Sequence, residues 1–181
     1  MRWIGPVIFW VSLPLIVQAE RSVAWSLNTG VAIPVSGSID AVATVGPSLS
    51  GEALYSVLDW CSLGIALSLN IPVPKTVRGL EPSVPYFLAI VARGLFHGGD
   101  AFKYWASLGV GLSYYGLPEC TDFCTDGEAV ARFGGDVSAG IGGRVTETLT
   151  IGPSASFVVP DFIRGTDIWF LTANVTMHWG L

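Results

Sequence analysis

The stretch Ile-Trp-Phe-Leu-Thr-Ala-Asn-Val-Thr-Met-His-Trp-Gly-Leu, residues 168–181, decides the fold. From Trp169 on, every second residue is apolar, whereas the residues between, from Thr172 to Gly180, are polar or small. This period of two predicts a β-strand, because successive side chains of a strand point to opposite faces. The alternation covers about 13 residues, which is longer than a half-buried strand of a soluble protein needs and suits a tilted membrane-spanning strand of about 9–11 residues with its ends.

The composition agrees with a membrane protein built from strands. The chain is 51% hydrophobic and only 13% charged, with 22 glycines. Beyond the N-terminal segment no apolar run approaches the length of a transmembrane helix, so the hydrophobic residues must be spread by alternation. The net charge is −5 and there is no basic run, which excludes nucleic acid as an expected partner.

Seven further segments alternate in the same way, most cleanly at 62–71. They are residues 22–35, 45–55, 62–71, 84–96, 104–115, 130–145 and 149–159. The connections between them are alternately short and long, as in outer-membrane barrels with short periplasmic turns and longer outer loops. The sequence therefore predicts an all-β fold, an eight-stranded antiparallel up-and-down transmembrane β-barrel, with both termini on the periplasmic side.

The first nineteen residues predict a secretory signal peptide. Arg2 provides a positive start, an apolar core follows, and Val17-Gln18-Ala19 is a small-residue cleavage pattern. An uncleaved membrane helix is the alternative, although the apolar run is shorter than the roughly 20 residues of a span. We expect residues 1–19 to be a signal peptide, removed near Ala19, and residues 20–181 to be one barrel domain in the outer membrane of a Gram-negative bacterium.

Over nearly all of residues 22–181 the pattern resembles the small eight-stranded outer-membrane proteins of the OmpA, OmpX and OmpW type. The signal peptide, segments such as 46–50 and 60–65, and the closing strand carry the likeness. The resemblance implies that outer-membrane lipid and the barrel-assembly machinery are partners. We expect no cofactor. The resemblance also implies an assembly signal at the end of the last strand, formed here by Met177, Trp179 and Leu181, although these proteins usually end in an aromatic residue.

Charged residues on the polar face should lie in the narrow, side-chain-filled lumen of such a barrel. By parity these are Glu52, Arg93, Arg132, Asp136 and Arg144. Glu52, Arg93 and Arg144 are expected in the periplasmic half. Arg132 and Asp136 are expected in the outer half, about 13 Å apart along one strand, so that each needs a partner elsewhere. A structural network of ion pairs is the first interpretation, and a gate or narrow ion path is the second.

The chain has three cysteines. Cys120 and Cys124 fall in a predicted outer loop in an oxidising compartment, which favours a local disulfide. Metal binding is the alternative, but two sulfurs without a nearby histidine make an incomplete site, so no metal site is expected. Cys61, at a strand start, is expected to be a free thiol, either buried or facing lipid.

An enzyme that modifies lipid A would need a nucleophile with a base in reach. The two histidines are His97, in a predicted periplasmic turn, and His178, expected in the lumen. Neither is followed at two residues by a serine, the His-x-Ser arrangement of the deacylases, although spatial pairing stays open. We expect no catalysis and no catalytic residues.

Aromatic residues near the strand ends are predicted to form two interfacial girdles. They are Trp25, Tyr55, Trp60, Tyr86, Tyr104, Trp105, Tyr114, Tyr115, Trp169 and Trp179. In a soluble periplasmic ligand-binding barrel these aromatics would line a cavity and the outward rows would be polar. Here the large residues share the apolar face, which favours the membrane protein.

The expected role is therefore structural, or surface interaction with an extracellular ligand through the outer loops. A narrow pore for ions or small solutes is the alternative, and a lipid A-modifying enzyme and a soluble ligand-binding barrel are further alternatives.

Overall fold

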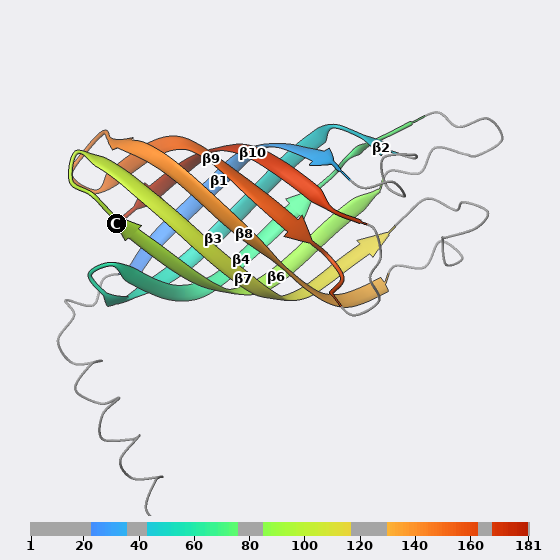
Figure 1. Ribbon diagram of the computed structural model, residues 1–181, viewed down its shortest axis with the longest axis horizontal. Coiled ribbons are helices and arrows are strands. Elements are labelled where there is room, and N and C mark those ends of the chain that lie inside the picture. The colour runs from blue at the N-terminus through green and yellow to red at the C-terminus, as the bar shows by residue number, and fades with distance from the viewer. Residues whose placement is uncertain (1–22, 36–42, 76–84, 117–129, 163–167, 181) are drawn as a thin grey trace, which may run out of the picture.

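The computed structural model describes residues 23–35, 43–75, 85–116, 130–162 and 168–180, and eight long strands in these ranges form one closed antiparallel barrel (Figure 1). The strands are β1 (Val23–Pro34), β3 (Gly46–Leu58), β4 (Cys61–Asn70), β6 (Tyr86–Gly98), β7 (Phe102–Gly116), β8 (Val130–Arg144), β9 (Leu149–Val159) and β10 (Phe170–Trp179). Each strand pairs with its neighbour in sequence, and β10 pairs with β1 to close the barrel. The predicted fold is confirmed.

The barrel has two unlike ends. The short β3–β4, β6–β7 and β8–β9 connections lie at one end, called the turn end, together with the start of β1 and the end of β10 (Figure 1). The four longer connections leave from the opposite end, called the loop end. There a small two-stranded sheet, β2 (Ala43–Thr44) with β5 (Val73–Pro74), extends β3 and β4.

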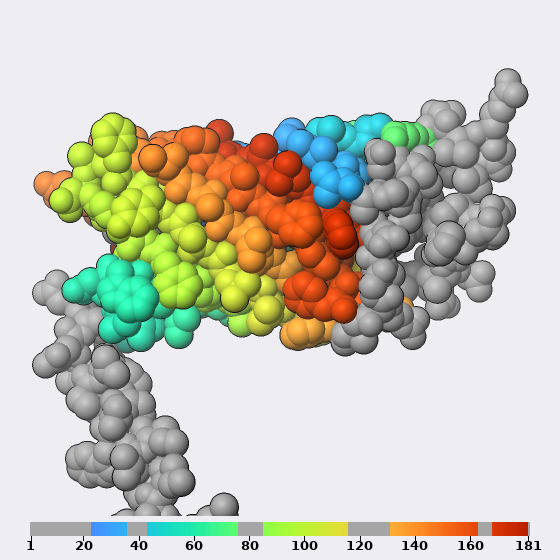
Figure 2. Space-filling view, in the orientation of Figure 1, coloured from blue at the N-terminus to red at the C-terminus, as the bar shows by residue number. Residues whose placement is uncertain are grey.

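The two faces of each strand differ as the alternation predicts. Burial alternates along β10, and the outward side chains of Ile65, Ile90 and Leu112 are 63%, 58% and 63% exposed. The inward face carries many serine, threonine, glycine and alanine residues together with a smaller number of large ones, because the interior of eight strands is narrow and filled by side chains. Figure 2 shows strands β7 to β10 forming a closely packed wall. The protein thus has an apolar outside and a polar inside, the reverse of a soluble globule.

Two of the predicted girdle aromatics face inward instead. Trp105 and Tyr115 are only 4% and 5% exposed, whereas Tyr104 and Tyr114 are 62% and 44% exposed. The reason is parity, because 105 and 115 share the inward face of β7 with Ser107 and Ser113. The aromatic residues therefore serve both the outer surface and the interior.

Candidate functional site: a polar chamber in the lumen

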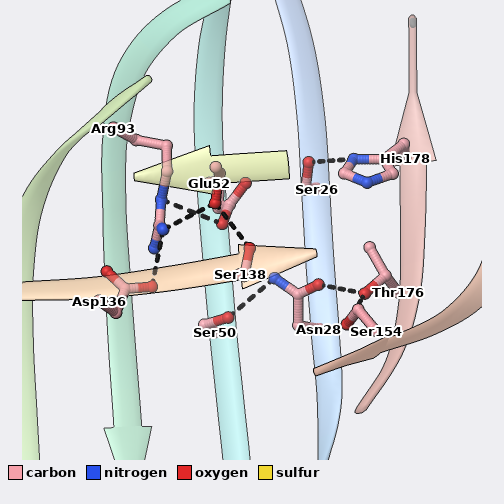
Figure 3. A network of polar contacts seen from close by, with 11 residues as sticks. Ser26, Asn28, Ser50, Glu52, Arg93, Asp136, Ser138, Ser154, Thr176 and His178 are labelled. Carbon is pink, nitrogen blue, oxygen red and sulfur yellow. Dashed lines mark hydrogen bonds and ion pairs between the residues drawn. The ribbon is translucent and has the colours of Figure 1, made fainter. Parts of the chain in front are cut away.

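A buried ion-pair network lies at the middle of the lumen (Figure 3). The Nη1 atom of Arg93 donates to Asp136 Oδ2 at 2.7 Å and to Ser107 Oγ at 2.9 Å. Its Nε lies 3.4 Å from Glu52 Oε1, so one guanidinium faces two carboxylates. The Arg93 and Glu52 side chains are 4% and 6% exposed, and that of Asp136 is 12% exposed. At this burial each charge depends on its partners.

Strand register brings Arg93 and Asp136 together. Both residues pair with Gly109, from β6 on one side and from β8 on the other. Because Gly109 has no side chain, the ion pair can form across β7. The sequence placed Arg93 and Asp136 in different halves of the barrel, and the tilt and stagger of the strands let them meet at one level.

A chain of hydrogen bonds between uncharged side chains continues from the ion pairs around the inner wall of the barrel. Asn28 donates to Ser50 Oγ at 2.9 Å, and its Oδ1 accepts from Thr176 at 2.6 Å. Thr176 and Ser154 are a further 2.6 Å pair, so this chain links β3, β1, β10 and β9 (Figure 3). These bonds satisfy polar side chains away from bulk water.

At the loop end the chamber is bounded by a buried aromatic cluster. Phe87 packs edge-on against Phe170, with ring centroids 4.4 Å apart, and stacks on Tyr115 at 5.5 Å. Phe87 and Phe170 are 3% and 0% exposed, and Ala32 and Ile168 complete the contact. These residues place a hydrophobic layer between the chamber and the longer connections.

At the turn end a second buried cluster bounds the chamber. It consists of Ala24, Leu54, Leu95 and Trp105, each at most 4% exposed. The Trp105 ring also meets the imidazole of His178 edge to face, with centroids 4.6 Å apart. The polar middle of the lumen is thus bracketed by one apolar layer on each side.

The cavity between the two layers has a volume of about 40 Å³, counted as space for the centres of water molecules. This is space enough for a few waters. The charged side chains that line it are Glu52, Arg93 and Asp136. Such a chamber can hold water or one small ion.

The other predicted lumen charges lie apart from this network. Arg132 lies near the loop end, where its Nε is 3.3 Å from Asp161 Oδ2. The Asp161 side chain is fully buried, and that of Arg132 is 25% exposed. Arg144 is exposed at the turn end of β8. Sequence analysis missed Asp161, because it lies beyond the alternating part of β9 in a segment read as loop.

The two histidines each contact a serine. His178 Nδ1 lies 2.5 Å from Ser26 Oγ, and both residues are buried, at 1% and 4% exposure. His97 Nε2 lies 3.4 Å from Ser62 Oγ, and Ser62 is 0% exposed. The spatial pairing that the sequence left open is therefore present, and both serines are buried.

The cysteines and the predicted assembly signal are described only in part. Cys61 is a free thiol and is 9% exposed. Cys120, Cys124 and Leu181 lie outside the described residues, so the disulfide stays a prediction, as do the signal peptide and its cleavage near Ala19. Trp179 is 37% exposed, and Met177 pairs with Leu27 across the β1–β10 seam.

Within the described ranges, no three histidine, cysteine, aspartate or glutamate side chains are grouped as a metal site requires. None of the described segments forms a helix that is long and apolar enough to cross a membrane.

Comparison with solved structures identifies the fold. Neisserial surface protein A is similar to this chain with a TM-score of 0.65 at 10% identity, covering 90% of this chain and all of the other. The N-terminal β-barrel domain of Pseudomonas aeruginosa OprF gives 0.51 at 12% identity, covering 86% and 97%. Yersinia pestis Ail in a phospholipid bilayer nanodisc gives 0.50 at 10% identity, covering 87% and 100%. No family model and no curated protein matches the sequence.

These likenesses and the apolar outer surface define the class of protein. The chain has the fold of the small eight-stranded outer-membrane β-barrels, and its exposed aliphatic residues are suited to lipid. The resemblance to this class predicted from the sequence is confirmed. At identities of 10–12% the likeness concerns the fold and not the biochemical role.

Proposed function

We propose that this protein is an integral outer-membrane barrel of a Gram-negative bacterium whose barrel is a closed membrane anchor. One observation carries the proposal: buried apolar layers, built around Phe87 and Phe170 at the loop end and around Leu95 and Trp105 at the turn end, bracket the polar chamber. A conducting lumen would need a polar path past both layers. In this proposal the protein has a structural role, or interacts at the cell surface through the connections at the loop end. Its partners are outer-membrane lipid, the barrel-assembly machinery and an extracellular ligand.

Surface labelling of intact cells tests this orientation. One variant carries an epitope tag between residues 122 and 123, in a connection at the loop end, and a matched variant carries it after Glu147, in the β8–β9 turn. We expect an antibody to label intact cells only for the first variant, and both variants after the outer membrane is permeabilised. If intact cells were labelled only in the variant tagged after Glu147, the barrel would have the opposite orientation. That result would contradict the proposed surface role.

A narrow pore is the second candidate, and the polar chamber is the observation in its favour. The chamber has room for a few waters and is lined by charged and hydroxyl side chains. A pore would show single-channel conductance that changes when Arg93 or Arg132 is replaced.

We propose no catalytic role. The Ser26–His178 pair has the distance of a nucleophile and its base, but its burial supports a structural hydrogen bond. Expression of the protein should leave the lipid A mass spectrum unchanged. A new lipid A species that disappears in His178→Ala or His97→Ala would establish an enzyme instead.

A further inference from the structure

With both of its carboxyl groups ionised, the chamber carries one more negative charge than positive charge. Its charged lining residues are the carboxylates of Glu52 and Asp136 and the guanidinium of Arg93. His178 also lines the cavity, but its Nε2 is buried without a hydrogen-bond partner among the described residues. A protonated imidazole would need an acceptor for each of its two N–H groups, so His178 is neutral here.

Glu52 is the less well compensated of the two carboxylates. Arg93 directs its Nη1 hydrogen bonds to Asp136 and Ser107, at 2.7 and 2.9 Å. Its Nε is 3.4 Å from Glu52 and forms no hydrogen bond with it. Glu52 is nevertheless only 8% exposed. Ser26 and Asn28 also hydrogen-bond to Glu52, but neither carries a charge. The charge of a carboxylate in this position must be balanced by a bound cation or by a proton, because burial removes the solvation that would otherwise stabilise it.

A second observation on the same cavity also indicates a missing partner. Asn70 lines the cavity and is 3% exposed, and its Oδ1 has no hydrogen-bond partner among the described residues. Buried amides are normally bonded to protein, water or a ligand. The cavity next to Asn70 is large enough for a small ion together with water.

We propose that the chamber binds one small monovalent cation, Na⁺ or K⁺. Glu52 supplies the opposing charge, and the serine hydroxyls, the Asn70 amide and enclosed water supply neutral oxygens. Oxygen donors suit hard cations, and a single charge balances the surplus of one, whereas a divalent ion would leave the chamber positive.

Unfolding of the full-length folded protein in detergent tests the proposal. The thermal midpoint is measured across a series of NaCl concentrations. Choline chloride, whose cation is much larger than Na⁺ or K⁺, holds the ionic strength constant. Above the dissociation constant, each tenfold rise in Na⁺ should raise the folded-to-unfolded ratio about tenfold. KCl replaces NaCl in a parallel series.

Three variants assign the effect to the chamber. Glu52→Gln and Asp136→Asn each remove the surplus charge and should abolish the dependence on Na⁺ and K⁺. Asp59→Asn, an exposed carboxylate in the β3–β4 turn, should keep the dependence of the wild type. If one lumen variant does not fold, the other still gives the answer. Native mass spectrometry of the wild type, which needs no variant, should show one retained alkali cation per chain.

Two results would overturn the proposal. One is a wild-type midpoint that does not change when Na⁺ or K⁺ replaces choline, with no retained cation in the native mass, because the surplus charge would then be carried by a bound proton. The other is an unchanged cation dependence in both Glu52→Gln and Asp136→Asn.

Discussion

The Asp136 carboxylate lies directly over Gly109: a Cβ atom at Gly109 would stand 2.4 Å from Asp136 Oδ1 and 3.2 Å from Arg93 Cζ. The ion pair at the centre of the lumen thus occupies the space that any other residue at 109 would fill. Packing and electrostatics are coupled at this point, because an added methyl group must displace a buried charge pair.

Gly109→Ala should therefore destabilise the barrel. We expect a loss of about 1–3 kcal/mol in the free energy of unfolding, since overpacking here also separates Arg93 from Asp136. Urea unfolding of the protein in lipid vesicles, followed by far-ultraviolet circular dichroism, measures the change. Gly51→Ala is the matched control, because a Cβ there meets nothing within 4 Å and should change stability by less than about 0.5 kcal/mol. Equal effects of the two substitutions would show that Gly109 has no special role.

A second prediction concerns the positive charge of Arg93. Arg93→Met leaves Glu52 and Asp136 facing each other without a guanidinium and should cost about 3–5 kcal/mol of unfolding free energy. The triple variant Glu52→Gln, Arg93→Met, Asp136→Asn should recover most of this loss. Arg144→Met, at the exposed end of β8, should be nearly neutral in the same vesicle assay. A triple variant as unstable as Arg93→Met would mean that the side chain acts through packing and not through its charge.

The layer at the turn end depends on a second glycine contact. A Cβ at Gly140 would lie 2.4 Å from Cε2 of the Trp105 ring, so Gly140→Ala should cost about 1–3 kcal/mol. Adding Trp105→Leu to Gly140→Ala should relieve part of the loss. Gly143→Ala on the same strand, where nothing lies within 4 Å of the new Cβ, should be tolerated. The thermal midpoints of the wild type, the two single glycine variants and the double variant measure these effects. If Gly140→Ala were tolerated, the indole ring of Trp105 would not lie against Gly140.

The lipid-facing surface makes a depth-dependent prediction. Ile65, which is 63% exposed in the middle of β4, faces the centre of the apolar belt, and Ile65→Arg should cost about 2–4 kcal/mol. Val145→Arg, just beyond the turn end of β8, introduces the same side chain at a position that is 61% exposed, and should cost about 0–1 kcal/mol. Unfolding titrations in lipid vesicles compare the free energies of unfolding of the two variants with that of the wild type. Similar costs at the two positions would indicate that the outer surface does not face lipid.

Alternation along each segment was sufficient to predict the barrel from the sequence. Strand β9, predicted at 149–159, is observed over Leu149–Val159, and β8 differs from its prediction by one residue. Period-two alternation determines which face every side chain takes, because a strand has only two faces. The same rule places Trp105 and Tyr115 inside the barrel. The prediction that these two aromatic residues belong to the interfacial girdles was wrong.

The contacts across the lumen could not be read from the sequence in the same way. Parity puts Glu52, Arg93 and Asp136 on the inward face, but it does not say which of them share a level. That depends on the stagger between strands, which accumulates around the tilted barrel. Asp161 was missed for a related reason, because its pairing with Arg132 arises from the fold of the chain after β9 and not from alternation.

The most direct test of the central claim, a closed barrel used as a membrane anchor, is the conductance of the folded wild-type protein in a planar lipid bilayer. We predict no single-channel steps in the wild type, and steps in a variant that combines Trp105→Gly with Phe87→Gly and so opens both apolar layers. Stable single-channel steps in the wild type that change with Arg93→Met would contradict the account and establish a pore.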